Sequence, residues 1–126
     1  MFVKVPRILL VEDDAVVQKA YEYFLECCGC SVAVLNDGRL VLDERLDDYD
    51  LILMDVGLPG TSGLVVSSLI RGDIKNTKIP IIALISSETG RSYEDYGIND
   101  VLIKPVIFDD LKEKLVKWLP DLVKIN

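Results

Sequence analysis

The sequence predicts an α/β fold, a doubly wound five-stranded parallel sheet with helices on both faces. Short apolar runs alternate with longer amphipathic stretches along the 126 residues, as expected for repeated β-α units. The apolar runs lack the strict polar alternation of half-exposed strands, which indicates that both faces of the sheet are buried. The chain has the length of one domain, and no linker, repeat or low-complexity segment divides it.

The first half of the chain predicts three strands and two helices. These are strands at 7–11, 31–35 and 50–54, and helices at 14–28 and 39–46. Apolar residues recur at three- and four-residue steps through the first helix, and Gly29 is a typical helix stop. In the short second helix, Leu40, Val41 and Leu46 are expected to face the core.

The second half predicts two more strands and two more helices. These are helices at 64–71 and 108–119, strands at 80–85 and 101–103, an irregular loop at 57–63 that is rich in Gly and Pro, and a polar stretch at 86–97 that holds at most a short helix. Gly72 is expected to end the helix at 64–71. Leu111, Leu115 and Leu119 form one apolar stripe on the last helix.

Composition excludes several classes of function. The chain has 14 Lys and Arg against 21 Asp and Glu, a net charge of −7, which argues against direct nucleic-acid binding. It has no His, which removes His-based catalysis and His metal ligands. No apolar run approaches the length of a membrane span, and the N-terminus does not resemble a signal peptide, so we expect a cytoplasmic protein without a membrane segment.

Three cysteines lie together as Cys27, Cys28 and Cys30. Such a cluster is compatible with a metal site, but a fourth ligand is hard to find without His. The favoured interpretation is the apolar end of a helix, a Gly stop and the start of a strand. An odd number of cysteines without a secretion signal indicates reduced thiols in a cytosol.

Polar residues follow the predicted strands at their carboxyl ends, where sites form in such sheets. These are Glu12, Asp13 and Asp14 after the first strand, Asp55 after the third, Ser86 and Ser87 after the fourth, and Lys104 after the fifth. Clustered carboxylates repel one another unless a cation joins them, and hard oxygen ligands suit Mg²⁺. Asp14 is also explained as a helix N-cap. A carboxylate nucleophile beside Mg²⁺ and a lysine suits phosphoryl transfer.

The motifs resemble the receiver domain of two-component response regulators over nearly the whole chain. The matching segments are ILLVEDD at 8–14, LILMDVGLPGTSG at 51–63, IPIIAL at 79–84 and LIKPV at 102–106. The resemblance implies a flavodoxin-like strand order 2-1-3-4-5. It also implies one receiver domain over 1–126, with no output domain in these residues.

The resemblance assigns roles to the site residues. Asp55 is implied as the phosphoacceptor, taking a phosphoryl group from a histidine kinase or a phosphotransfer protein, and Lys104 as a contact of that group. The implied Mg²⁺ ligands are Asp13, Asp55, the main-chain carbonyl of Gly57 and, through water, Glu12. The implied loop-shaping residues are Pro59, Gly63 and Pro105. Such a receiver assists its own phosphorylation and is not a turnover enzyme. A downstream protein is expected on the face of the fourth helix, fifth strand and fifth helix.

Two positions depart from the family pattern. Ile85 stands where a Thr or Ser is usual, and Val101 where an aromatic residue is usual, so we expect an atypical switch. Ser86 or Ser87 is able to replace the missing hydroxyl only if the strand ends early or bulges.

Two other functions stay open. One is a pseudo-receiver, a protein-interaction module that works without phosphorylation. The other is a phosphatase-type hydrolase with an Asp nucleophile, which ranks last because Gly57 stands where such enzymes need a second Asp.

Overall fold

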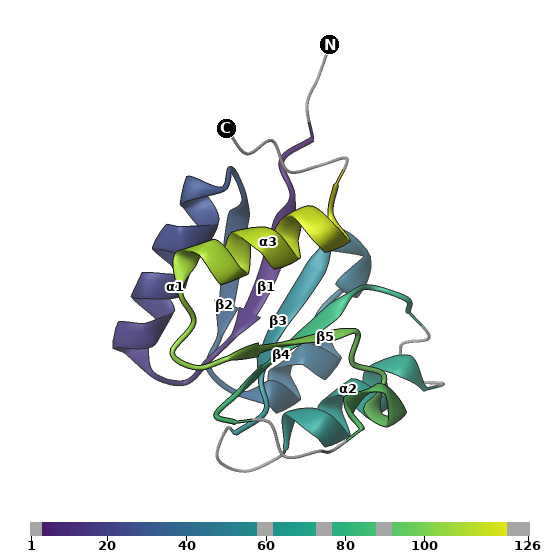
Figure 1. Ribbon diagram of the computed structural model, residues 1–126. Helices are drawn as coiled ribbons and strands as arrows, with labels where there is room; N and C mark the ends of the chain where they lie inside the picture. The colour runs from purple at the N-terminus through teal and green to yellow at the C-terminus, as the bar shows by residue number, and fades with distance from the viewer. Residues whose placement is uncertain (1–3, 58–61, 73–76, 88–91, 121–126) are drawn as a thin grey trace.

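The computed structural model describes residues 4–57, 62–72, 77–87 and 92–120, which form a parallel sheet covered on both faces (Figure 1). The strands are β1 (Arg7–Val11), β2 (Ser31–Leu35), β3 (Leu51–Asp55), β4 (Ile81–Ile85) and β5 (Asp100–Ile103). The α-helices are α1 (Ala15–Cys27), α2 (Gly63–Arg71) and α3 (Phe108–Trp118). The described residues also form the short 3₁₀ helices η1 (Gly38–Asp43), η2 (Leu46–Asp48) and η3 (Tyr93–Tyr96).

The sheet has the strand order β2-β1-β3-β4-β5 with every pair parallel, which confirms the predicted fold and order. The register places the carboxyl ends of the strands at one edge. Val11 pairs with Met54, Asp55 with Leu84, and Ile85 with Ile103. Residues that directly follow β1, β3, β4 and β5 therefore emerge close together.

Two apolar clusters fill the spaces between the sheet and its helices. Alternate strand residues face each cluster, as the pleat requires. Ile8, Leu53 and Leu84 pack toward α1 and α3, whereas Leu9 and Met54 pack toward α2 and the 3₁₀ helices. Figure 1 shows α1 and α3 on one face and α2 on the other. Burial on both faces explains the unbroken apolar runs in the sequence.

Helix α1 begins and ends as predicted. The Asp14 side chain accepts hydrogen bonds from the backbone N–H groups of Val16 and Val17 at 2.9 and 3.2 Å, which makes Asp14 the N-cap. Gly29 follows the helix with φ +83°, a conformation that favours glycine.

The three cysteines lie where α1 ends and β2 begins. Cys27 is exposed, Cys28 and Cys30 are buried in the core beside α1, and all three are free thiols. This is the placement that the favoured interpretation of the cluster predicts. Burial raises the pKa of Cys30 to about 11, so this thiol is a packing residue rather than a nucleophile.

The predicted helix at 39–46 is wrong as a single α-helix. The structure has two 3₁₀ helices there, η1 and η2. A 3₁₀ helix rises about 2.0 Å per residue, compared with 1.5 Å in an α-helix, so few residues return the chain along the sheet. Val41 and Leu46 are buried as predicted, but Leu40 is 42% exposed and faces solvent, contrary to the prediction.

The polar stretch after β4 contributes only η3 within its described part, and Arg71 clamps it to α2. The Arg71 guanidinium donates to the carbonyl oxygens of Gly97 and Thr77, both at 2.9 Å, and to Asn99 Oδ1 at 2.8 Å. Asn99 Oδ1 also accepts from the Ile81 N–H at 2.8 Å. One side chain therefore joins α2 to the turns that precede β4 and β5.

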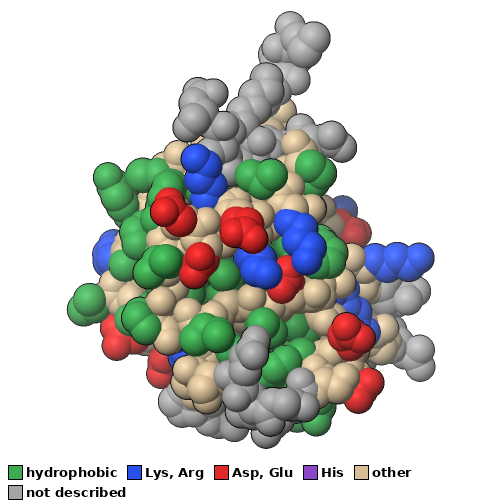
Figure 2. All heavy atoms as spheres, in the orientation of Figure 1, with side chains coloured by type: hydrophobic (Ala, Val, Ile, Leu, Met, Phe, Trp, Pro, Cys, Tyr) green, Lys and Arg blue, Asp and Glu red, His purple; other side chains and the backbone are tan. Residues whose placement is uncertain are grey.

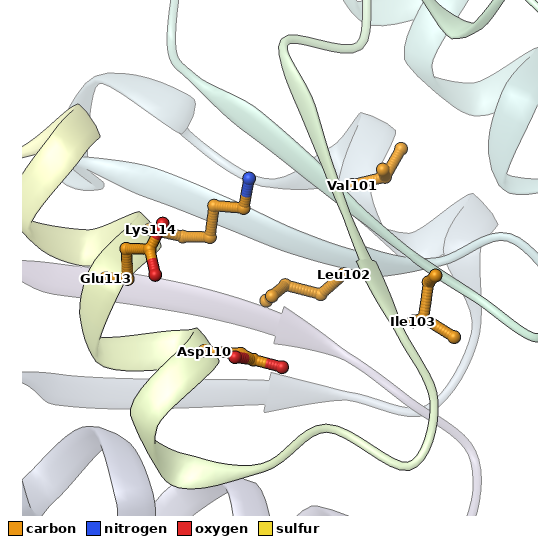
Figure 3. Close-up of a pocket in the computed structure, with 6 residues that line it drawn as sticks. All are labelled: Val101, Leu102, Ile103, Asp110, Glu113 and Lys114. Atoms are coloured by element: carbon orange, nitrogen blue, oxygen red, sulfur yellow. The ribbon is translucent and has the colours of Figure 1, made fainter. Parts of the chain in front are cut away.

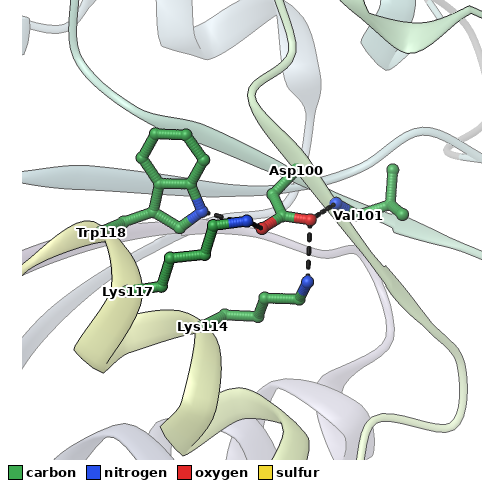
Figure 4. A network of polar contacts seen from close by, with 5 residues as sticks. All are labelled: Asp100, Val101, Lys114, Lys117 and Trp118. Carbon is green, nitrogen blue, oxygen red and sulfur yellow. Dashed lines mark hydrogen bonds and ion pairs between the residues drawn. The ribbon is translucent and has the colours of Figure 1, made fainter.

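A second polar network joins edge strand β5 to α3 (Figure 4). Asp100 accepts hydrogen bonds from Lys114 Nζ and Trp118 Nε1, both at 2.9 Å, from the Val101 N–H at 2.9 Å and from Lys117 Nζ at 3.3 Å. The face that carries α3 shows acidic and basic side chains interspersed, with no continuous basic surface (Figure 2). In the described part of the chain, none of the helices is both long and apolar enough to cross a membrane.

Candidate functional site

A pocket at the carboxyl edge of the sheet collects most of the predicted site residues. It is lined by Glu12, Asp13, Asp14, Val17, Tyr21, Asp55, Gly57, Ser86, Lys104 and Pro105. Asp55 is the last residue of β3, Val17 and Tyr21 belong to α1, and the others lie in the loops after β1, β3, β4 and β5. The parallel register brings them together, because each strand ends at the same edge.

Asp55 and Lys104 form the centre of the site. Lys104 Nζ lies 3.0 Å from both Asp55 Oδ1 and Oδ2. The Gly57 backbone N–H donates to Asp55 Oδ1 at 2.8 Å. The Asp55 side chain is only 5% exposed, and that of Lys104 is 26% exposed. The carboxylate is thus held in a fixed orientation at the base of the pocket.

The two buried carboxyl groups have pKa values that are shifted in opposite directions. Burial first, and then a hydrogen bond with Asp55, raise the pKa of Glu12 from 4.5 to about 8. Burial acts in the same direction on Asp55, but hydrogen bonds from Glu12, the Gly57 N–H and Lys104 outweigh it, so the pKa of Asp55 lies below its usual value. At neutral pH Asp55 is ionised, and Glu12 carries a proton in the absence of a cation.

Glu12, Asp13 and Asp55 are arranged to bind a metal ion. One carboxylate oxygen from each lies within 4.8 Å of the others. Glu12 is 4% exposed, and its Oε2 atom has no hydrogen-bond partner in the described structure. A buried acceptor without a donor is costly, and a hard divalent cation that keeps several waters suits this set of oxygens. The residues present therefore fit Mg²⁺.

The loop residues are placed only in part. A Cβ atom on Gly63 would lie 2.9 Å from the Asp55 carbonyl oxygen and from Val56 Cα, so glycine lets the start of α2 pack against the end of β3. Pro105 lines the pocket and follows Lys104 through a cis peptide bond. Pro59 lies outside the described residues.

The two positions that depart from the family pattern belong to the apolar packing on the α2 face of the sheet. Ile85 is 2% exposed in the cluster on the α2 face, and Val101 packs against the same cluster. Ser86 and Ser87 are both exposed, but only Ser86 is among the residues that line the pocket. Ser86 is therefore the serine after β4 that borders the site.

Sequence reasoning missed two residues of α1 that support the site. Gln18 Nε2 donates to the Glu12 carbonyl oxygen, which ties the acidic loop to the helix. Tyr21 belongs to the residues that recur at three- and four-residue steps along this helix, yet its hydroxyl accepts from the Val106 N–H at 3.4 Å and it lines the pocket. Gln18 and Tyr21 both carry a polar atom on the inward face of the helix that follows the acidic loop. This combination is the sequence signal that could have identified them.

A sheet of order 2-1-3-4-5 with its site at the carboxyl edge places the chain among the flavodoxin-like α/β proteins. Residues 8–116 match the response regulator receiver domain, and the chain belongs to this family. Receiver domains are modules of two-component and phosphorelay signalling rather than metabolic enzymes.

Individual relatives agree with this assignment. The chain is 37% identical over 123 residues to the transcription factor SKN7 of Saccharomyces cerevisiae, a match that covers 94% of this chain but 20% of that protein. The chain spans about a fifth of the length of the curated fungal transcription factors that it matches.

Two solved structures resemble the chain closely in fold. The receiver domain of the sensor histidine kinase PA1611 from Pseudomonas aeruginosa, with a magnesium ion in its active-site cleft, has a TM-score of 0.79 and 32% identity, covering 93% of this chain and 99% of that one. The receiver domain of Ssk1 from Saccharomyces cerevisiae, in complex with the histidine phosphotransfer protein Ypd1, also has a TM-score of 0.79, with 26% identity and coverages of 94% and 91%.

Proposed function

We propose that the protein is a phosphoacceptor receiver that takes a phosphoryl group on Asp55. One observation carries the proposal: the ionised Asp55 carboxylate lies 3.0 Å from Lys104 Nζ and within 4.8 Å of oxygens of Glu12 and Asp13. A nucleophile, a cation for the transferred oxygens and a set of metal ligands are then present in one pocket.

Asp13 and Asp55, the carbonyl of Gly57 and, through water, Glu12 would hold Mg²⁺. When bound, this ion supplies positive charge that offsets the repulsion between the carboxylates and the phosphoryl oxygens. The Gly57 N–H and Lys104 orient the Asp55 carboxylate in the pocket. Lys104 then exchanges its contact with Asp55 for a contact with an oxygen of the phosphoryl group.

The phosphodonor is a phosphorylated histidine of a kinase or phosphotransfer protein. The bond between phosphorus and the imidazole nitrogen breaks as a bond to Asp55 oxygen forms, and the histidine leaves as neutral imidazole after taking a proton from solvent. This chain has no His of its own. A similar receiver domain that is part of a sensor histidine kinase and another that is bound to a histidine phosphotransfer protein support this class of donor.

The output of this receiver is atypical. Ile85 offers no hydrogen bond to a phosphoryl group and Val101 has no ring to move, so Ser86 is the candidate donor from β4. The downstream partner binds on the face of η3, β5 and α3. These elements stand where the sequence predicted the fourth helix, the fifth strand and the fifth helix. Val101, Leu102 and Ile103 line a shallow pocket on this face together with residues of α3 (Figure 3). In this proposal residues 1–126 act as a receiver unit.

Ile85 and Val101 also favour a second candidate, a pseudo-receiver that binds its partner without phosphorylation. One experiment distinguishes the phosphoacceptor receiver from the pseudo-receiver. The chain is incubated with a small phosphodonor and Mg²⁺, and its intact mass is measured alongside that of Asp55→Asn. The proposal expects an adduct of one phosphoryl group on the wild type alone, lost when Mg²⁺ is chelated. A wild type without an adduct would favour the pseudo-receiver, and an equal adduct on Asp55→Asn would place the acceptor elsewhere.

A further inference from the structure

Tyr21 is a buried residue of α1 that touches the loop that carries Lys104. Its side chain lines the pocket with Lys104 and Pro105, and the residue is only 6% exposed. Its hydroxyl oxygen accepts a hydrogen bond from the backbone N–H of Val106 at 3.4 Å. This contact joins residues 85 positions apart in the chain, so it fixes α1 relative to the end of β5.

The Lys104 segment is anchored on both sides of its side chain. The Lys104 N–H donates to the Ile85 carbonyl oxygen of β4 at 2.7 Å. Two residues later, the Val106 N–H donates to Tyr21. Between these two anchors the ammonium group reaches Asp55. The second anchor is the one that comes from outside the sheet.

We propose that Tyr21 is a positioning residue, whose hydroxyl holds the segment 104–106 against α1 and so fixes the Lys104 ammonium at Asp55. The inference rests on the proposed phosphoacceptor function and adds a residue to it. Positioning within a fraction of an ångström has a large effect on a transfer step, because Lys104 must meet oxygens that gain charge in the transition state.

The ring and the hydroxyl of Tyr21 have separable roles. The ring belongs to the core on the α1 face and lies beside Phe24, with 6.4 Å between ring centroids. Phenylalanine would keep that packing and remove only the acceptor for Val106. Burial raises the pKa of Tyr21, so the group removed is a neutral phenol.

The test compares Tyr21→Phe with Tyr23→Phe in the same helix. Tyr23 is 65% exposed and is not among the residues that line the pocket. For each variant three quantities are measured: the rate of Asp55 phosphorylation at saturating small phosphodonor, the affinity for Mg²⁺, and the NMR signal of the Lys104 side-chain ammonium without metal or donor.

We expect Tyr21→Phe to slow phosphorylation by about threefold to tenfold, the effect of losing one hydrogen bond. The Lys104 signal shifts, whereas the Mg²⁺ affinity stays that of the wild type, because the carboxylates lie at the ends of β1 and β3 and not on the segment that Tyr21 holds. Tyr23→Phe leaves all three quantities unchanged.

Two results would overturn the inference. One is an unchanged rate and an unchanged Lys104 signal in Tyr21→Phe. The other is a slower rate with an equal loss of Mg²⁺ affinity, which indicates general loosening of the site. If the wild type takes up no phosphate, the proposed function fails, and the Lys104 signal still decides whether Tyr21 positions that residue.

Discussion

At the scale of single residues, the site separates two neighbouring carboxyl groups by their surroundings. Asp55 receives hydrogen bonds from Lys104 and from the Gly57 N–H and stays ionised. Glu12 is buried with one oxygen unpartnered and is protonated at neutral pH in the absence of a cation. Environments that move two pKa values apart favour two roles: in the proposed function the ionised Asp55 acts as the nucleophile, and Glu12 would release its proton to bind a cation.

Glu12→Gln is expected to flatten the dependence of metal-free stability on pH. The folded protein keeps the Glu12 proton up to a pKa of about 8, whereas the unfolded chain loses it near 4.5. Between these pKa values the unfolded state binds fewer protons than the folded state, so the free energy of unfolding falls as pH rises. Gln carries no titratable proton, so the variant does not show this fall in stability. Melting temperatures measured in chelator from about pH 5 to 8 test this.

The same variant should also lose much of its stabilisation by millimolar Mg²⁺, since a ligand that prefers the native state raises its stability. Glu26→Gln, at an exposed position of α1, is the control and should behave as the wild type. Parallel pH curves for Glu12→Gln and the wild type would show that Glu12 does not titrate in this way.

Gly63→Ala is expected to destabilise the fold by about 1–3 kcal/mol, the usual cost of overpacking. The added methyl would lie 2.9 Å from backbone atoms of Asp55 and Val56, which are not free to move. Gly72→Ala is the matched control, since its methyl would meet nothing closer than 3.5 Å. Urea unfolding measures both changes, and equal midpoints for the two variants would contradict the packing argument.

At the scale of elements, periodicity predicted the strands and the α-helices because each buries a continuous apolar face. The end of α1 followed from Gly29, and its start from the side-chain oxygen of Asp14. The segment 39–46 could not be settled in this way. Its apolar residues suit both a 3₁₀ and an α-helix, and the distance the chain must cover decides between them. Because the segment forms 3₁₀ helices, Leu40 faces solvent and not the core, where an α-helix would have placed it.

Asp100→Asn is expected to lower stability by about 1–3 kcal/mol at neutral pH, because it removes a nearly buried charge from the network with Lys114 and Trp118. The network holds the pKa of Asp100 at about 2, below its usual 3.8, in spite of burial. At a pH between these two pKa values, the Asp100 carboxyl therefore binds fewer protons in the folded state than in the unfolded state. The contribution of Asp100 to the free energy of unfolding, about 2 kcal/mol, is complete above about pH 5 and is lost as pH falls toward 2.

The difference between Asp100→Asn and the wild type should then shrink as the pH is lowered from about 5 toward 2, as followed by urea unfolding. Asp47→Asn, at an exposed position of η2, should show a small effect at every pH. A pH-independent difference for Asp100→Asn would mean that its charge is not the stabilising feature.

At the scale of the whole molecule, the parallel topology made the candidate site predictable. Polar residues that follow separate strands meet at one edge whatever the loops between them do, and so Glu12, Asp55 and Lys104 could be grouped from sequence order alone. Tyr21 and Arg71 could not be found in this way. Apart from the Asn99 side chain, their hydrogen-bond partners are backbone groups of distant turns, and a backbone group leaves no mark in the sequence.

The whole molecule also restricts how a phosphoryl group on Asp55 would be sensed. A ligand shifts an equilibrium only through contacts that differ between two states. Ile85 is packed in the core without a hydroxyl, and Arg71 holds Gly97 and Asn99 next to β5. We therefore expect phosphorylation to rearrange the face of η3, β5 and α3 less than is usual in the family, with Ser86 as the main remaining contact from β4.

Amide exchange with and without phosphorylation measures this rearrangement directly. Small protection changes over residues 93–119 are expected, larger around the loops that line the pocket, and Ser86→Ala should reduce them further. Ser87→Ala is the control, because Ser87 is not among the residues that line the pocket. Arg71→Lys releases part of the clamp on the η3 turn and should widen the response, if that clamp is what restrains the face. Wide changes that persist in a Ser86→Ala, Ser87→Ala double variant would show that the signal leaves the site by another route, since neither hydroxyl of β4 would then be needed to carry it.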